Sequence, residues 1–172
     1  MKKIRNILFL SLMVTVISTG AFAQNKKPRV SPPETATGMI KKATITIHYS
    51  SPSVKDRKIW GGLVPYDSVW RAGANEATTF ETTRDIKVQG KLLPAGKYAF
   101  FLIPKENDQW IAVFNNVPIQ WGAFKYDQSK DQLRVTVKPK KAAMKQEMLV
   151  YHITSGGFLL DWENLSVPVS IK

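Results

Sequence analysis

The chain of 172 residues carries 25 lysines and arginines against 13 acidic residues, a formal net charge of +12, and contains no cysteine. With 44% hydrophobic and 10% aromatic residues, the composition is that of a globular protein rather than a disordered or collagen-like one. The absence of cysteine excludes disulfide scaffolds, cysteine-ligated zinc, iron–sulfur clusters and cysteine nucleophiles. Because only two histidines are present, a three-histidine metal site within one chain is excluded as well.

The first 23 residues have the three-part order of a secretory signal peptide. Basic residues at positions 2, 3 and 5 precede an apolar run over 7–17, and small residues end the segment at Ala21-Phe22-Ala23. The order predicts cleavage near Ala23 and an extracytoplasmic protein, either periplasmic or secreted. An uncleaved anchor is the alternative, but the apolar run is shorter than the roughly 20 residues that span a bilayer. We therefore expect no transmembrane segment after cleavage.

Residues 24–42 follow as a basic leader. They contain five basic side chains and one acidic one, are punctuated by three prolines and a glycine, and show no apolar period. We interpret them as an extended linker with little packing of its own. For a secreted domain of modest charge we expect no nucleic-acid partner. Contact with anionic lipids or glycans of the envelope is the better electrostatic interpretation, and a basic surface that only keeps the protein soluble is the simpler one.

From residue 43 onward the sequence alternates with period two. Ile45, Ile47 and Tyr49 share one face of the first run, and threonines and a histidine share the other. Similar runs rich in β-branched and aromatic residues follow, separated by glycine and proline breakers. They cover 77–82, 86–88, 97–103, 110–115, 133–138, 147–154, 158–163 and 167–171. About nine short strands predict a single all-β domain over 43–172, an antiparallel β-sandwich or jelly roll, with a barrel as the alternative.

Two stretches between these runs are more irregular. The sequence Leu93-Pro94-Ala95-Gly96 suits a type I turn, so residues 84–115 are interpreted as a small antiparallel meander. Residues 140–146 mix alanines and a methionine with lysines. We expect a solvated loop there, with a single helical turn as the alternative.

A segment of about 25 residues between Ser50 and Thr79 breaks the alternation. It holds two of the five tryptophans and five further large apolar residues, which is more apolar surface than disordered segments carry. Connections of this length are uncommon in compact domains and are often functional. The segment is predicted to be ordered and to pack across one end or face of the sandwich.

Two motifs in this segment resemble a known family. They are Arg-Lys-Ile-Trp-Gly-Gly-Leu-Val-Pro at 57–65 and Val-Trp-Arg-Ala-Gly-Ala-Asn-Glu-Ala-Thr at 69–78. Together with Leu-Pro-Ala-Gly-Lys-Tyr at 93–98, they are similar to the hallmark of a secreted bacterial family, the domain of unknown function numbered 2911. The similarity covers nearly all of 43–172. One departure is Asp56, where the family is expected to favour glycine, which bears on the shape of that turn. The resemblance implies an extracytoplasmic single domain and no established activity, cofactor or catalytic residue.

The candidate ligand-binding residues gather mainly in the same segment. Guanidinium groups hold carboxylates or phosphates in planar pairs of hydrogen bonds, carboxamides and carboxylates suit sugar hydroxyls, and exposed aromatic rings stack on sugars. On these grounds the candidates are Arg57, Trp60, Trp70, Arg71, Asn75, Glu76, Trp121 and Tyr126. The structural alternative is that Arg71 and Glu76 pair with each other or cap backbone groups, and so hold the long connection in place. Trp110 and Trp162 lie in strand patterns and are expected in the core, whereas Trp121 is the tryptophan expected to be accessible.

Three functions are compatible with these residues. The preferred hypothesis is a non-enzymatic binding domain for a polar envelope ligand, a glycan or a peptide. A hydrolase of envelope material that uses Glu76 with His48 or with another carboxylate is the first alternative. No G-x-S-x-G elbow is present, and a metal site at His48 is disfavoured, so we assign no catalytic residue, cofactor or metal. A structural or assembly protein is the second alternative, and the oligomeric state is left open.

Overall fold

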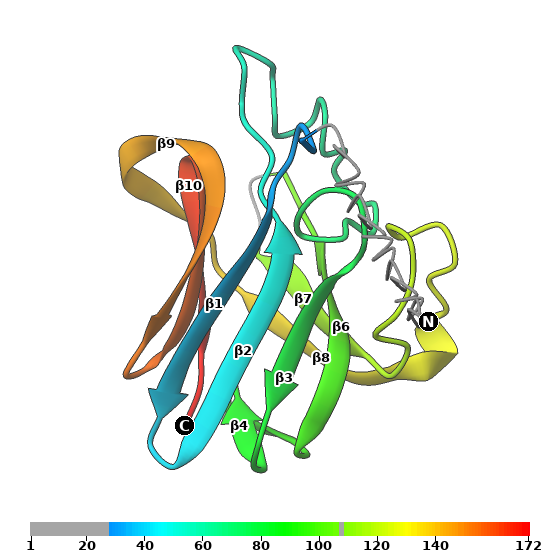
Figure 1. Cartoon of the computed structure of the whole chain (residues 1–172), viewed down its shortest axis with the longest axis vertical. Coiled ribbons are helices and arrows are strands. Elements are labelled where there is room, and N and C mark those ends of the chain that lie inside the picture. Colours follow the sequence, from blue (N-terminus) through cyan, green and yellow to red (C-terminus); the bar gives the residue numbers. More distant parts are fainter. Residues whose placement is uncertain (1–27, 107–108) are drawn as a thin grey trace, which may run out of the picture.

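The structure is a computed structural model in which residues 28–106 and 109–172 are described (Figure 1). The predicted signal peptide and the start of the leader lie outside the described residues. The elements that follow are strands and one short 3-10 helix. They are β1 Pro33–Ile40, β2 Ala43–Ser50, β3 Thr78–Thr82, β4 Ile86–Val88, β5 Lys91–Leu93, β6 Gly96–Ile103, β7 Trp110–Asn115, η1 Gln128–Lys130, β8 Asp131–Val137, β9 Lys140–Thr154 and β10 Gly157–Ser170. The predicted all-β fold is confirmed.

The strands form a large antiparallel sheet and two hairpins. The sheet has six strands in the order β1-β2-β3-β6-β7-β8. The long strands β9 and β10 pair as a second layer beside it, and β4 with β5 makes a small hairpin at the lower end (Figure 1). The predicted meander over 84–115 is therefore divided between this hairpin and the β6–β7 pair of the large sheet. The arrangement is that of an antiparallel sandwich.

The main core lies between the two layers and is rich in aromatic rings. Phe100 of β6 contacts Phe114 of β7 at 5.2 Å and Phe158 of β10 at 5.4 Å between ring centroids. Each such buried side chain stabilises the fold by about 1.5–3 kcal/mol. A smaller cluster that includes Phe101 and Val113 occupies the other face of β6 and β7. The large sheet is thus covered on both faces at β6 and β7, but its outer face at β1–β3 carries polar side chains.

Strand β1 corrects the interpretation of the leader. Residues 33–40, expected to be part of an extended linker, pair with β2 along their whole length, from Pro33 opposite Ser50 to Ile40 opposite Ala43. They lacked an apolar period because β1 is an edge strand whose side chains are mostly exposed. Edge strands tolerate proline at the first position and polar residues throughout, since their backbone hydrogen bonds supply the pairing.

The last two strands also differ from the prediction. Residues 140–146 are neither a loop nor a helical turn but the first half of β9. Their side chains are exposed or half-buried, so lysines are tolerated on a paired strand. The two runs predicted at 158–163 and 167–171 join in β10, whose register with β9 shifts on both sides of Glu163. That irregularity, at a residue with φ of 55°, interrupts the alternation that would have indicated one strand.

Candidate functional site

The 50–79 segment is ordered and packs across the upper end of the sandwich, as the sequence predicted (Figure 1). Trp60 is only 8% exposed, and its ring lies 4.9 Å from Trp110 and 5.8 Å from Trp162. Trp70 is partly buried against the same cluster and stacks on Trp162 at 5.7 Å. Asp56 takes a φ of 54°, the left-handed conformation that glycine favours, which aspartate tolerates better than most residues. Trp60 is therefore a core residue rather than a ligand contact.

A second segment, 116–127, is fixed on the outer face of the sheet by the buried side chain of Asn115. The Asn115 Nδ2 donates to the Asp127 carbonyl at 2.9 Å and to Asp131 Oδ1 at 2.8 Å. Asn115 Oδ1 accepts from the Val117 N–H at 3.0 Å. Further along, the Ala77 N–H donates to the Gln120 carbonyl at 3.0 Å. These bonds place the apolar side chains of 117–124 beside the start of β3.

Tyr126, a predicted ligand-binding residue, has its hydroxyl engaged within the protein. It donates to Asp131 Oδ2 at 2.6 Å and accepts from Arg134 Nη1 at 2.7 Å. Arg134 also bonds Asp131 Oδ2 at 2.8 Å. Burial and the neighbouring Asp131 carboxylate raise the pKa of Tyr126 to about 12. The ring packs edge-on against Phe101 at 5.3 Å, so Tyr126 anchors the 116–127 segment.

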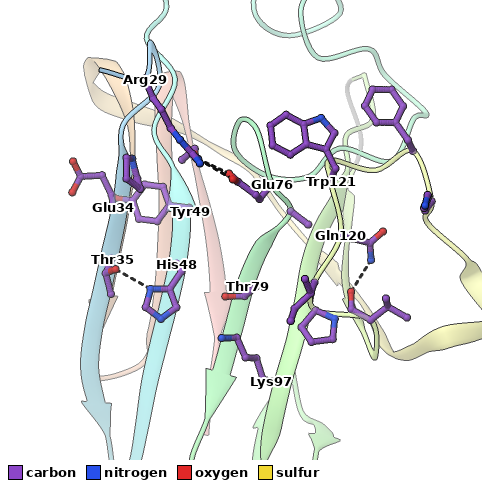
Figure 2. Close-up of a pocket in the computed structure, with 18 residues that line it drawn as sticks. Arg29, Glu34, Thr35, His48, Tyr49, Glu76, Thr79, Lys97, Gln120 and Trp121 are labelled. Carbon is purple, nitrogen blue, oxygen red and sulfur yellow. Dashed lines mark hydrogen bonds and ion pairs between the residues drawn. The ribbon is translucent and has the colours of Figure 1, made fainter. Parts of the chain in front are cut away.

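A cleft of about 1240 Å³ lies between the outer face of β1–β3 and the 117–125 segment. We call it the sheet cleft. Its floor carries side chains of neighbouring strands, its wall carries large apolar side chains, and its upper end is formed by an ion pair (Figure 2). The floor is Thr35, His48, Thr79 and Lys97; the wall is Val117, Ile119, Trp121 and Phe124; the ion pair is Arg29 with Glu76.

The floor of the sheet cleft is polar because β1, β2 and β3 present their solvent faces there. Thr35, His48 and Thr79 are direct neighbours in the strand register, and Thr35 Oγ1 bonds His48 Nδ1 at 2.9 Å. The Thr79 hydroxyl is buried and has no hydrogen-bond partner among the described residues, and the same is true of Gln120 Oε1. Buried polar atoms are normally paired, so these two oxygens are unusual features of the cleft lining.

The wall of the sheet cleft is strongly exposed. Ile119 is 90%, Phe124 83% and Trp121 58% exposed. An isolated exposed apolar side chain is ordinary, but a contiguous group facing a cleft is typical of interaction sites. The prediction that Trp121 is the accessible tryptophan is confirmed, since Trp60, Trp110 and Trp162 are buried and Trp70 is partly buried.

Glu76 pairs with the leader and not with Arg71. Arg29 Nη1 lies 2.9 Å from both carboxylate oxygens of Glu76. A hydrogen bond from the Glu76 backbone N–H, assisted by Arg29, lowers the pKa of the carboxyl. The neighbouring Asn75 donates through Nδ2 to the Ser31 carbonyl at 3.3 Å. The expected pairing of Arg71 with Glu76 is therefore wrong. Glu76 and Asn75 instead hold residues 29–31 against the domain.

A second pocket of about 640 Å³ lies beneath the 50–76 segment. We call it the arginine pocket. Three predicted residues line it: Arg57, Trp70 and Arg71. Arg57 donates through Nε and Nη2 to the carbonyls of Val54 and Ser53, so it closes its own loop. Arg71 is half-buried, its Nε has no hydrogen-bond partner within the described part of the chain, and burial lowers the pKa of its guanidinium. Phe124 lines both this pocket and the sheet cleft.

Five of the eight predicted residues line one of the two pockets, whereas Trp60, Asn75 and Tyr126 line neither. Glu76 and Trp121 line the sheet cleft, whereas Arg57, Trp70 and Arg71 line the arginine pocket. Sequence reasoning missed Arg29 and Thr35, which belong to the leader, as well as Thr79. It also missed the apolar wall, for which a signal exists: valine, isoleucine, tryptophan and phenylalanine at 117, 119, 121 and 124 stand in a turn-rich stretch without strand alternation.

Over 28–106 and 109–172, no three histidine or acidic side chains are grouped so that they could hold a metal ion. The same residues include no helix with the length and hydropathy needed to cross a membrane.

Comparison with known proteins identifies the family. The family described as a protein of unknown function, DUF2911, matches residues 31–171. No curated protein and no solved structure matches the chain. The match begins two residues before β1 and ends one residue after β10, so it includes the strand that the sequence had placed in the leader. The chain therefore belongs to the DUF2911 family.

Proposed function

We propose that the chain is a non-enzymatic binding protein of the cell envelope and that its sheet cleft takes a saccharide. The proposal rests on one observation, the exposed apolar wall around Trp121 that faces a polar floor across an open cleft. A sugar ring has surfaces that match both, because its C–H face is apolar like the wall and its rim carries hydroxyl groups that suit the polar floor. The extracytoplasmic location is part of the proposal, and the predicted signal peptide supports it.

The chemistry of the lining fits such a ligand. Trp121 offers a flat ring for stacking, and the floor offers both donors and acceptors for hydroxyl groups. The unpartnered oxygens of Thr79 and Gln120 are acceptors that a sugar hydroxyl would satisfy after a small side-chain rotation. The volume of about 1240 Å³ exceeds that of most small-molecule pockets, which favours an oligosaccharide segment over a monosaccharide.

The contacts of Glu76 favour binding over hydrolysis. Glycoside hydrolysis needs one protonated carboxyl group and a second, ionised one at a fixed separation. Glu76 is held ionised by its own backbone N–H and by Arg29, and this lowered pKa makes it a weak base and a poor proton donor. His48, the histidine on the floor, is bonded to Thr35. A second carboxylate, Glu34, also lines the cleft, but it shares no hydrogen-bond partner with Glu76 among the described residues.

Tryptophan fluorescence provides the test. All five tryptophans lie in the described residues, and Trp121 is far more exposed than the three buried ones. Titration with the peptidoglycan disaccharide of N-acetylglucosamine and N-acetylmuramic acid is expected to shift the emission to the blue as water leaves the indole. The Trp121→Ala variant is expected to bind about fivefold more weakly by calorimetry, which corresponds to about 1 kcal/mol of lost ring contact.

A matched control separates stacking from a general change in the protein. Trp121→Phe retains an aromatic ring in the wall and is expected to keep most of the affinity while losing the fluorescence response. A stem tetrapeptide without sugar serves as the competing ligand. Binding of the tetrapeptide but not of the disaccharide, or an affinity unchanged in Trp121→Ala, would overturn the saccharide proposal.

A further inference from the structure

We propose that the arginine pocket is a separate binding site for the carboxylate of an apolar organic acid, with Arg71 as its anchor. The pocket lies beneath the 50–76 segment and has its own lining, of which only Phe124 is shared with the sheet cleft. The inference is therefore independent of the saccharide proposed above.

Arg71 differs from the other arginines whose contacts are described near these sites. Arg29 pairs with Glu76, Arg57 bonds two carbonyls, and Arg134 pairs with Asp131. Arg71 is half-buried, and among the described residues it makes no ion pair and its Nε bonds to nothing. A buried guanidinium Nε–H without an acceptor is costly, because that N–H has lost water and gained no partner. An anion supplied from outside would remove that cost.

The second unpartnered group in the pocket is also a donor. Trp162 lines the pocket and is 1% exposed, and its indole Nε1 has no hydrogen-bond partner in residues 28–106 and 109–172. Indole and guanidinium nitrogens carry protons and accept none. Their natural partner has lone pairs and no proton, which describes a carboxylate or a phosphate better than a hydroxyl. In the sheet cleft the unpartnered atoms are oxygens instead, so the two sites differ in the ligand chemistry they can satisfy.

The charge and the apolar residues of the lining indicate which kind of molecule bears the anionic group. Among the described residues no aspartate or glutamate lines the arginine pocket, whereas Lys55 and Arg57 do. Its remaining lining is mixed: three serines, Ser31, Ser53 and Ser68, stand beside large apolar side chains that include Leu63, Val69 and Trp70. Inorganic phosphate would leave these apolar side chains uncovered, but an acid with an aromatic or aliphatic group covers them while its carboxylate meets Arg71. The volume of about 640 Å³ suits a molecule of that kind.

The test compares an acid with its neutral amide. N-acetyl-L-phenylalanine and N-acetyl-L-phenylalanine amide differ only in the group that would meet Arg71. Calorimetry on the whole protein at 150 mM salt is expected to show the acid binding at least about tenfold more tightly, the usual scale for one charge-assisted contact. Equal affinity for acid and amide would refute the proposal without any mutation.

Two substitutions locate the contact. Arg71→Gln is expected to reduce acid binding at least about tenfold, and Arg71→Lys to retain part of it. Lys55→Gln removes the same charge from the lining of the same pocket and serves as the matched control; we expect less than a twofold change. Equal losses in Lys55→Gln and Arg71→Gln would show a general attraction for anions and would overturn the assignment. If Arg71→Gln does not fold, Arg71→Lys and the acid–amide comparison still decide.

Two further measurements distinguish a carboxylate site from a phosphate site, and the arginine pocket from the sheet cleft. Phenyl phosphate binding more tightly than the acid would overturn the choice of carboxylate. Trp121→Ala, which alters only the sheet cleft, is expected to leave acid binding unchanged. Loss of acid binding in that variant would show that the two sites are one, whereas failure of saccharide binding alone leaves the carboxylate site standing.

Discussion

Replacing Asn115 with alanine tests how the wall of the sheet cleft is held. Asn115 is fully buried and makes three hydrogen bonds: to the Asp127 carbonyl, to Asp131 Oδ1 and from the Val117 N–H. A neutral hydrogen bond contributes about 1 kcal/mol and one to a charged group about 2 kcal/mol. The three together give about 3–4 kcal/mol, part of which returns when water reaches the freed groups. We expect Asn115→Ala to lower the free energy of unfolding by about 3 kcal/mol.

Urea denaturation followed by far-UV circular dichroism measures this loss. With a denaturant slope of about 2 kcal/mol per molar, the midpoint is expected to fall by about 1.5 M. The adjacent Asn116 provides the control, because it is exposed and makes one side-chain bond, to Gln132 at 3.2 Å. Asn116→Ala is expected to change the free energy of unfolding by less than about 0.5 kcal/mol. A similar loss in both variants, or a loss below about 1 kcal/mol in Asn115→Ala, would refute the reasoning.

Three further predictions concern the backbone, the pH dependence and the leader. A Cβ at Gly157, whose φ is 148°, would lie 2.0 Å from the Val169 carbonyl oxygen, so Gly157→Ala is expected to cost more than about 2 kcal/mol in urea denaturation. Gly156→Ala meets nothing within 4 Å and is expected to stay within about 0.5 kcal/mol. Because Tyr126 keeps its proton to about pH 12 when folded and a free tyrosine loses it near pH 10.0, the contribution of Tyr126 to stability is expected to be constant below pH 10.0 and to be lost as the pH rises toward about 12. Stability curves that are flat across that range, or absorbance at 295 nm showing Tyr126 ionised at pH 10.0, would contradict this. Glu76→Gln breaks the exposed ion pair with Arg29, so the free energy of unfolding of the protein is expected to change by less than about 1 kcal/mol. A larger loss would mean that this ion pair stabilises the whole domain and not only the attachment of the leader.

The sequence predicted the interior of the fold well because half-buried strands must alternate. Strand β2 points Ile45, Ile47 and Tyr49 into the main core, as the period-two pattern predicted. Strand β1 was missed since an edge strand with an exposed surface needs no such pattern, and its pairing with β2 is a matter of backbone register. The lysines of 140–146 were misread for the same reason, because exposure on a strand and exposure on a loop look alike in sequence.

The candidate site was predicted only in part, because its composition depends on contacts between distant segments. Trp121 was recognised as accessible, and Glu76 was chosen as a polar group of the connection. Their meeting beside one cleft depends on the bridge between these two residues and on the Ala77–Gln120 hydrogen bond, which no local pattern encodes. Arg29 reaches Glu76 across 47 residues of sequence, so a contact from the leader was beyond inference from spacing. Trp60 resembled a ligand contact by type and is instead part of the core.

Backbone amide chemical shifts can show directly whether a saccharide binds in the sheet cleft. The purified protein is labelled with nitrogen-15 and titrated with the peptidoglycan disaccharide, and backbone shifts are followed residue by residue. We expect the largest changes in the sheet cleft, at 117–124 and around Thr35, His48 and Thr79. The arginine pocket around Arg71 is expected to change little, apart from the shared Phe124. Changes centred elsewhere on the molecule, or none at millimolar disaccharide, would contradict the account.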